Sequence, residues 1–339
     1  MSYLINPYWY AAAGSAPFYQ ELGRETLGSD QGEVDVTGLT DKPYLMFLAS
    51  YDCSTSVDAF INFNNDETAN YANRYSRDGG ADATDVNQSI GLRLEQGSTN
   101  PQFSVMFAYN KAAQEKLIIG NTTSQNTASA SNAPNRQEFV GKWVNTSDAI
   151  DQVSLDRASG NFLSGSELVI LGCDPADTTG TNFWEELGTT TASGGEDSLS
   201  VTVDKKYLWF QMYKIQSGGT TEANLRFNGV TASDYAWRIS TNGSADAAFG
   251  SQARLVVDRI ASTTPSFSSG FIINNADQEK LVTSVCVAED VTGVGTAPAR
   301  RELSGKWADS TTAITSVDMT NEDVGSYGAG SFITVWGHD

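Results

Sequence analysis

Short alternations of apolar and polar residues recur along the chain. They occur in "EVDV" at 33–36, "QVSL" at 152–155, "SLSVTV" at 198–203 and "SVDM" at 316–319. A period of two is that of a β-strand with one buried face. These four segments are therefore predicted to be half-buried strands.

Continuous apolar runs form a second class of segment. They are "YLMFL" at 44–48, "ELVIL" at 167–171, "YLWF" at 207–210 and "FITVW" at 332–336. The runs are short, rich in β-branched and aromatic residues, and mostly flanked by Gly or Pro. Such runs are typical of strands inside a sheet, so these segments are predicted to be buried strands.

Helical periodicity is weak throughout. The best candidates are "NKAAQEKL" at 110–117 and "NADQEKL" at 275–281, for which we predict helices of two turns at most. Clusters of Gly, Ser, Thr and Asn separate the apolar segments, as in "TNGS" and "QSGGTT", and such clusters favour turns. The pattern as a whole predicts an all-β protein.

The chain repeats itself. "RQEFVGKWVNTSDAI" at 136–150 is matched by "RRELSGKWADSTTAI" at 300–314, and "AAQEKL" at 112–117 by "ADQEKL" at 276–281, both with an offset of 164 residues. Collinear matches run from about residue 18 to the C-terminus, with gaps of one or two residues. A match held in register over this length indicates a tandem duplication.

The repeat sets the predicted domains. Residues 1–17 form an N-terminal arm, 18–175 a first domain and 176–339 a second, joined in the polar loop "DPADTTGT" at 174–181. Many short strands in a unit of about 160 residues indicate a β-sandwich or jelly roll. The prediction is thus two tandem jelly-roll or β-sandwich domains preceded by an extended arm.

The tryptophan of the repeated motif is the predicted core of each domain. Trp143 and Trp307 are expected to fill the space between two sheets, since an indole supplies a large share of local burial. Gly141 and Gly305 precede them by two residues and are expected to mark a bulge or the start of a strand.

Charge narrows the range of partners. The 339 residues include 41 acidic and 21 basic ones, for a formal net charge of −20. The acids are scattered, which indicates a solvated acidic surface that would repel phosphate backbones, so no nucleic-acid partner is expected. No stretch reaches the roughly 18 apolar residues of a membrane helix, and no membrane association is expected.

The residues needed for most common kinds of catalytic or metal site are absent from the sequence or unfavourably placed in it. The single histidine, His338, lies next to the C-terminus, which disfavours histidine-dependent catalysis. Cys53, Cys173 and Cys286 are widely spaced and form no CxxC motif, so they are expected to be buried apolar residues rather than disulfide partners or zinc ligands. No phosphate-binding glycine motif occurs, and no cofactor is expected.

Carboxylates alone suffice for glycoside hydrolysis. The acids retained in both repeats are Glu115/Glu279, Glu138/Glu302 and Asp82/Asp246. A catalytic site rarely persists in both copies of a duplication, so this retention favours a structural role. Arg136/Glu138 and Arg300/Glu302 should each share one strand face.

One loop has the composition of a calcium site. "RDGGADATD" at 77–85 carries Asp78, Asp82 and Asp85, and carboxylate oxygens are ligands for Ca²⁺. Its copy "TNGSADAAF" keeps only Asp246. A polar turn is the favoured interpretation, and no metal site is predicted.

The repeated motif resembles a module of tailed-bacteriophage virion proteins. The resemblance rests on "GKWVNTSDAIDQVSL…GNFLSGSELVILG" and its copy "GKWADSTTAITSVDM…GAGSFITVWG", and on the opening "YLINPYWYAA". The family module has a Trp strand, a polar turn, an Ala-Ile strand and a terminal Gly-Ser strand. The resemblance implies a virion component without saying which one, because head and tail proteins share such modules.

The N-terminal arm is the predicted assembly element. Its two prolines, Pro7 and Pro17, interrupt any regular helix, and its aromatic side chains would form a large apolar patch if left in water. The residues predicted to make assembly contacts are Tyr3, Leu4, Ile5, Pro7, Tyr8, Trp9 and Tyr10. We expect the arm to pack either on its own body or on a neighbour in an assembly, and we favour the neighbour.

The resemblance and the arm together favour a non-enzymatic capsid decoration or cement protein on the virion surface. Its expected partners are the major capsid protein, neighbouring virion proteins and other copies of itself, with a trimer as the guessed homo-oligomer. A tail-fibre, tail-tip or adhesive protein is the alternative, in which solvent-facing indoles bind host carbohydrate. The candidates are Trp184, Trp209, Trp237 and Trp336, none of which has a Trp counterpart in the other repeat, although drift of core residues explains them more simply. A carboxylate-dependent glycanase is the third possibility.

Overall fold

The computed structural model describes residues 18–95, 97–289 and 294–339, and every helix-or-strand element among them is a β-strand. The predicted arm at 1–17 lies outside the described residues. The chain divides into two compact units. Unit 1 comprises the described residues up to Ser124 together with Arg136–Trp184, and unit 2 comprises Gln125–Asn135 and Glu185–Asp339.

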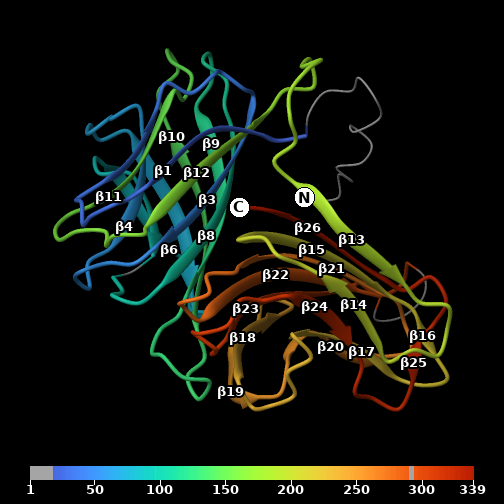
Figure 1. Ribbon diagram of the computed structural model, residues 1–339. Coiled ribbons are helices and arrows are strands. Elements are labelled where there is room, and N and C mark those ends of the chain that lie inside the picture. Colours follow the sequence, from blue (N-terminus) through green and yellow to red (C-terminus); the bar gives the residue numbers. More distant parts are fainter. Residues whose placement is uncertain (1–17, 96, 290–293) are drawn as a thin grey trace. The chain divides into compact units, whose positions relative to one another are not determined.

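Unit 1 is a two-layer sandwich of an eight-stranded and a four-stranded sheet (Figure 1). The large sheet has the order β1-β12-β3-β8-β9-β10-β5-β6 and the small sheet the order β2-β11-β4-β7. The strands are β1 (Gln20–Thr26), β2 (Val34–Thr37), β3 (Tyr44–Tyr51), β4 (Ala59–Phe63), β5 (Tyr71–Arg77), β6 (Ala83–Gln88), β7 (Leu92–Glu95), β8 (Gln102–Tyr109), β9 (Lys116–Ser124), β10 (Asn135–Trp143), β11 (Gln152–Arg157) and β12 (Glu167–Cys173).

Unit 2 has the same two layers and one additional two-stranded ribbon. Its large sheet has the order β13-β26-β15-β21-β22-β23-β18-β19, its small sheet β14-β24-β17-β20, and its ribbon β16-β25. The strands are β13 (Glu185–Thr191), β14 (Ser198–Thr202), β15 (Tyr207–Lys214), β16 (Gln216–Ser217), β17 (Thr221–Phe227), β18 (Tyr235–Thr241), β19 (Ala247–Gln252), β20 (Leu255–Ser262), β21 (Ser266–Ile273), β22 (Lys280–Ala288), β23 (Ala299–Trp307), β24 (Ser316–Thr320), β25 (Ser326–Tyr327) and β26 (Phe332–His338).

The two units share one topology. When β16 and β25 are set aside, each strand of unit 1 has a counterpart at the same place in the sheets of unit 2. Even the bulge in the first edge strand recurs, between Glu21 and Gly23 in unit 1 and between Glu186 and Gly188 in unit 2. The predicted tandem β-sandwich fold is confirmed, and the duplication seen in the sequence is a duplication of the whole sandwich.

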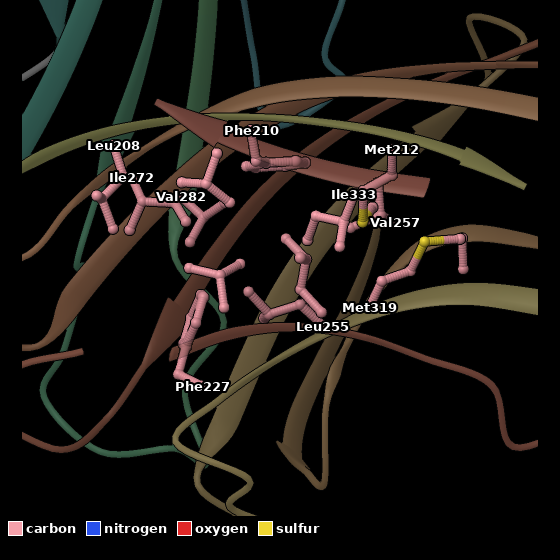
Figure 2. Packing of buried hydrophobic residues seen from close by; sticks show 14 of the residues in the cluster. Leu208, Phe210, Met212, Phe227, Leu255, Val257, Ile272, Val282, Met319 and Ile333 are labelled. Carbon is pink, nitrogen blue, oxygen red and sulfur yellow. The ribbon is translucent and has the colours of Figure 1, made fainter. Parts of the chain in front are cut away.

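The core of each unit lies between its two sheets. In unit 2, Leu208 and Phe210 of β15 and Ile272 of β21 point from the large sheet toward Leu255 of β20 and Met319 of β24 (Figure 2). Unit 1 has a cluster of the same design, with β3 opposite β4 and β11. The alternating segments at 33–36, 152–155, 198–203 and 316–319 all supply strands of the small sheets, as their period of two predicts.

The continuous apolar runs are strands of the large sheets, as predicted, and they are apolar on both faces. In β3, Leu45 and Phe47 belong to the core cluster, whereas Met46 and Leu48 point the opposite way and are also buried. In β15, Trp209 likewise lies outside the core cluster of unit 2. We call the face of each large sheet that is turned away from the small sheet its second face.

Two local predictions were wrong. The segments 110–117 and 275–281 form turns followed by strands β9 and β22 rather than helices. In the first turn the backbone N–H of Gln114 donates to the carbonyl of Lys111 (3.0 Å), and β9 then begins at Lys116. The segment joins two antiparallel neighbours, β8 and β9, so a hairpin turn is the shorter connection.

The motif glycines do not mark bulges. Gly141 lies within β10, where the ladder to β5 is regular. A Cβ at this position would lie 2.6 Å from Leu92 of the small sheet, and one at Gly305 would lie 2.9 Å from Leu255. The glycines are thus needed because the two sheets approach closely there.

Candidate functional site

The two motif tryptophans occupy equivalent buried places. Trp143 is fully buried, with its ring centroid 5.9 Å from that of Phe63 and 6.5 Å from that of Tyr71. Trp307 is also buried, at 5.9 Å from Phe227 and 6.4 Å from Tyr235. Each tyrosine OH bonds to the backbone of the adjacent phenylalanine in the small sheet, so the aromatic cluster ties the two layers together.

Two asparagines, one buried and one half-buried, hold the loop that follows each tryptophan. This Trp-to-Ile loop comprises residues 144–150 in unit 1 and 308–314 in unit 2. In unit 1, the side chain of Asn110 accepts from Ile150 N (2.7 Å), and that of Asn64 donates to Ala149 O (2.7 Å). In unit 2, Asn274 and Asn228 make the same bonds to Ile314 N (2.6 Å) and Ala313 O (2.9 Å).

A buried lysine completes each clamp. Lys116 Nζ donates to the carbonyls of Asn145 (2.8 Å) and Asp148 and lies 5.1 Å from the ring centroid of Trp143. Lys280 Nζ donates to Asp309 O (2.7 Å) and lies 5.4 Å from Trp307. Burial lowers the pKa of both ammonium groups. The residues most obviously shared by the two repeats are therefore structural.

Replacing Lys116 by methionine should lower the stability of unit 1 by about 1–3 kcal/mol, because it removes the buried donor that the loop carbonyls of Asn145 and Asp148 accept from. The measurement is chemical denaturation of the full chain, followed by hydrogen exchange of peptides from unit 1. Lys111→Met is the matched control, since Lys111 is exposed and an exposed substitution should change stability by less than about 0.5 kcal/mol. Equal effects of the two substitutions would contradict the clamp.

The repeated acids mostly form ion pairs with neighbouring bases. Glu138 lies 3.2 Å from Arg136, Glu302 lies 3.6 Å from Arg300, and Asp82 lies 3.5 Å from Arg74. Each Arg–Glu pair shares a strand face, as predicted. Asp246 is half-buried. Glu115 and Glu279 pair with the lysines of the two GKW motifs, Lys142 and Lys306.

The aspartates of the loop at 77–85 are directed to different partners. Asp78 Oδ1 accepts from Arg136 N (2.9 Å), and Asp85 Oδ2 accepts from Arg93 Nε (2.8 Å). Over residues 18–95, 97–289 and 294–339, no group of three or more His, Cys, Asp or Glu side chains is arranged to hold a metal ion.

The four indoles proposed as carbohydrate contacts are buried. Trp237 stacks on Phe249 at 3.9 Å within the core of unit 2, and Trp209 lies between Phe271 (5.7 Å) and Trp336 (5.1 Å). Trp184 packs edge-on against Phe183 at 5.0 Å. Each of the four is at most 4% exposed, which agrees with the simpler interpretation that they are core residues and leaves none of them available to stack on a sugar.

The remaining sequence candidates fit a structural role. Cys53, Cys173 and Cys286 are free and buried, and burial raises the pKa of all three thiols. His338 ends β26, with its Nδ1 2.8 Å from Asp339 O. In the described part of the chain there is no helix with the length and hydropathy needed to cross a membrane.

The second face of unit 1 carries an exposed apolar row. Tyr44, Tyr109 and Leu117 stand directly opposite one another on β3, β8 and β9 and are 45%, 41% and 61% exposed. The two tyrosine rings are 5.6 Å apart. Val140 of β10 is also exposed. Neighbouring apolar side chains on one sheet face are a feature of interaction surfaces.

The ion pair of Glu115 and Lys142 lies beside this row. Its N–O distance is 3.0 Å, and the two side chains are 43% and 44% exposed. We call Tyr44, Tyr109, Leu117, Val140, Glu115 and Lys142 the unit 1 surface. In the sequence Glu115 stands out only as a repeated acid, and nothing marks the other five residues as a surface. The retention of Glu115 and Lys142 in both repeats was the available signal.

Comparisons with known proteins add little. No protein-family model and no curated protein matches the chain. A solved structure of domains LG4-5 of the mouse laminin alpha1 chain has 11% identity and a TM-score of 0.20, with 95% of this chain and 90% of that one covered. The attachment invasion locus protein Ail of Yersinia pestis, solved with the heparin analogue sucrose octasulfate, has 5% identity and a TM-score of 0.13 over 84% of this chain and 100% of that one. Neisserial surface protein A has 7% identity and a TM-score of 0.14 over 86% and 98%. Similarities this weak carry no inference about function.

Proposed function

We propose that this protein is a non-enzymatic structural component of a tailed-bacteriophage virion. In the form we favour, it decorates or cements the capsid, binding the major capsid protein and neighbouring copies of itself. The proposal starts from the resemblance of the duplicated Trp motif and of the opening "YLINPYWYAA" to virion proteins.

The observation that best supports the proposal is that the repeated residues have a structural role. The most conspicuous ones, from Asn110 and Lys116 to Trp143, hold one loop to one sandwich, in both units alike. A chain of two such rigid modules with an exposed apolar row fits a protein whose work is adhesion. Two modules per chain would raise the apparent affinity for a repetitive shell through multivalency.

The test is a map of native particles in which this chain carries a label. Label on the faces of the shell supports decoration of the capsid. Label at the tail supports the alternative, a tail-fibre, tail-tip or adhesive protein. Absence of label from purified particles contradicts both. A glycanase, the third possibility, would release reducing ends from bacterial polysaccharide when incubated with the purified protein.

Removing residues 1–17 should leave a folded protein that no longer associates with particles. The expected loss follows from the apolar aromatic composition of the arm, which suits it for burial against a neighbour. Co-sedimentation with particles that lack the protein measures the association, and circular dichroism checks the fold. Undiminished co-sedimentation of the folded truncation would show that the arm is not the attachment.

A further inference from the structure

A segment between two strands of unit 1 belongs to unit 2. Residues Gln125–Asn135 connect β9 to β10 but cluster with unit 2. They cover an ion pair on the second face of its large sheet. Lys306 Nζ donates to Gln125 O (3.2 Å) and Thr127 O (2.7 Å), and Glu279 accepts from Ser129 N (2.6 Å).

The C-terminal part of the same segment is held by β18 and β19, which come after β23 in the large sheet of unit 2. Arg238 Nε donates to Pro134 O (2.9 Å), and Ser251 N donates to Ala130 O (2.5 Å). The side chains of Lys306 and Glu279 are consequently only 0% and 5% exposed, with an N–O distance of 2.8 Å. Unit 2 thus contains a complete site for a short extended segment.

Unit 1 has nearly the same set of receiving residues, and they are exposed. Glu115, Lys142 and Arg74 are identical to their counterparts Glu279, Lys306 and Arg238. Their side chains are 43%, 44% and 57% exposed. Asn87 stands where unit 2 has Ser251, and both residues have a φ of about +52°, so the backbone of the edge strand is bent alike in the two units.

The chain also has a second segment of the docking type. Residues 294–298, "VGTAP", precede β23 and align with 130–134, "ASNAP", which precede β10. Val294, the counterpart of Ala130, is fully exposed. In each molecule the face of unit 2 is therefore already occupied by residues 125–135. Residues 294–298 and the corresponding face of unit 1 are both exposed.

We propose that Glu115 and Lys142 of the unit 1 surface, together with the neighbouring Arg74 of β5, bind residues 294–298 of a second copy of this chain. Residues 294–298 would lie along β10, β5 and β6 as residues 130–134 lie along β23, β18 and β19. Lys142 would donate to the carbonyl of the partner's Glu289, and Arg74 to that of the partner's Pro298. The contact is heterologous, so repeated association gives a closed ring or an open chain. The proposed function includes binding to neighbouring copies of this chain. The present inference rests on that part of it and names the residues in contact.

The two faces also differ at the residue before Asn87 and Ser251. Val86 replaces Gly250, where an added Cβ would lie 2.2 Å from the carbonyl oxygen of Ser131. The incoming loop carries Gly295 in place of Ser131, and glycine permits backbone conformations that move this carbonyl away. The bulkier residue is on the loop in unit 2 and on the sheet in unit 1. Val86→Gly should therefore tighten the association.

The test is sedimentation velocity of the purified full chain over a series of concentrations, without particles. The wild type should associate reversibly. Lys142→Glu should weaken association about tenfold or more, because it places a like charge beside Glu115 and the partner's Glu289. Val294→Asp should do the same from the loop side. Lys111→Glu, the same charge change at another exposed lysine of unit 1, should have little effect.

Mixing the two variants gives the decisive result. The Lys142→Glu copy keeps an intact loop and the Val294→Asp copy keeps an intact face, so an equimolar mixture should form dimers and nothing larger. A monomeric wild type, an unaffected Lys142→Glu variant, or a mixture that stays monomeric would each overturn the inference. Because no particle is present, these outcomes are independent of the particle-labelling test of the proposed function.

Discussion

Replacing Trp307 by alanine is expected to lower the stability of unit 2 by about 3–5 kcal/mol, and Trp143→Ala should do the same to unit 1. Each indole is buried against a phenylalanine and a tyrosine, and each lies under the lysine that holds the Trp-to-Ile loop. Truncation leaves a cavity and removes the ring on which that ammonium rests.

Because the chain has two units, the effect must be read from each unit separately. Native-state hydrogen exchange of the full chain does this, since peptides from the two sandwiches can be followed side by side. Trp143→Ala should speed exchange in peptides of unit 1 and leave those from the small sheet of unit 2, such as β14 and β24, unchanged. Equal loss of protection in both units would show that the sandwiches are not independent cores.

Phenylalanine at the same positions separates packing from hydrogen bonding. Trp143 Nε1 donates to Asp66 Oδ2 (2.7 Å), whereas Trp307 Nε1 has no hydrogen-bond partner among the described atoms. Desolvation raises the pKa of Asp66, but hydrogen bonds from Thr68, Asn70 and Trp143 bring it below its ordinary value. Trp143→Phe should therefore cost about 1–3 kcal/mol more than Trp307→Phe. The reverse order would contradict this account.

The fold could be predicted from the sequence because two signals agreed. The period of two at 152–155 identified β11, and the internal repeat transferred each assignment to the other unit. The two helices failed because local propensity favours a helix in "QEKL" whereas the tertiary structure needs Lys116 and Lys280 as the first residues of strands, with Nζ inside the loop clamp.

The unit 1 surface could not be predicted in the same way. Tyr44 begins the run "YLMFL", and nothing in that run shows that Met46 is buried while Tyr44 is exposed. Glu115 and Glu279 are the same residue in the same motif, so the sequence cannot show that one ion pair is covered and the other open. The difference arises from a segment that is distant in sequence, Gln125–Asn135.

The second large effect that we expect is a pH dependence of stability caused by one buried carboxyl group, that of Glu95. Glu95 at the end of β7 is fully buried, and neither of its oxygens has a hydrogen-bond partner in the described structure; Arg77 lies 3.6 Å away. Burial raises the pKa of Glu95 to about 8, against a smaller opposing effect of Arg77 and a small reinforcing effect of Asp78. The folded state thus holds a proton that the unfolded chain releases near pH 4.5.

The sign of the pH dependence follows. Between pH 4.5 and about 8 the folded protein binds more protons at Glu95 than the unfolded chain does, so stability is fully present below this window and falls as pH rises through it. Each pKa unit is worth about 1.4 kcal/mol, and the loss should be on the order of 4 kcal/mol. Glu95→Gln should remove most of this slope and make unit 1 more stable than the wild type at pH 8, as measured by hydrogen exchange at pH 5 and pH 8.

The equivalent position of unit 2 supplies the control. There, replacing the acid by its amide should lower the stability of the unit rather than raise it. Asp258 stands at the place of Glu95, but Lys214 replaces Tyr51 and lies 2.7 Å from the carboxylate, with Ser266 at 2.6 Å and both charged side chains fully buried. Asp258→Asn leaves a buried ammonium without its counter-charge, which should cost about 3–5 kcal/mol. If Glu95→Gln destabilised unit 1 at pH 8 as Asp258→Asn destabilises unit 2, Glu95 would have to be ionised and paired in the folded protein. If Glu95→Gln stabilises unit 1 and Asp258→Asn destabilises unit 2, then Asp258 is buried as an ion pair with Lys214, whereas Glu95 is buried in its protonated form.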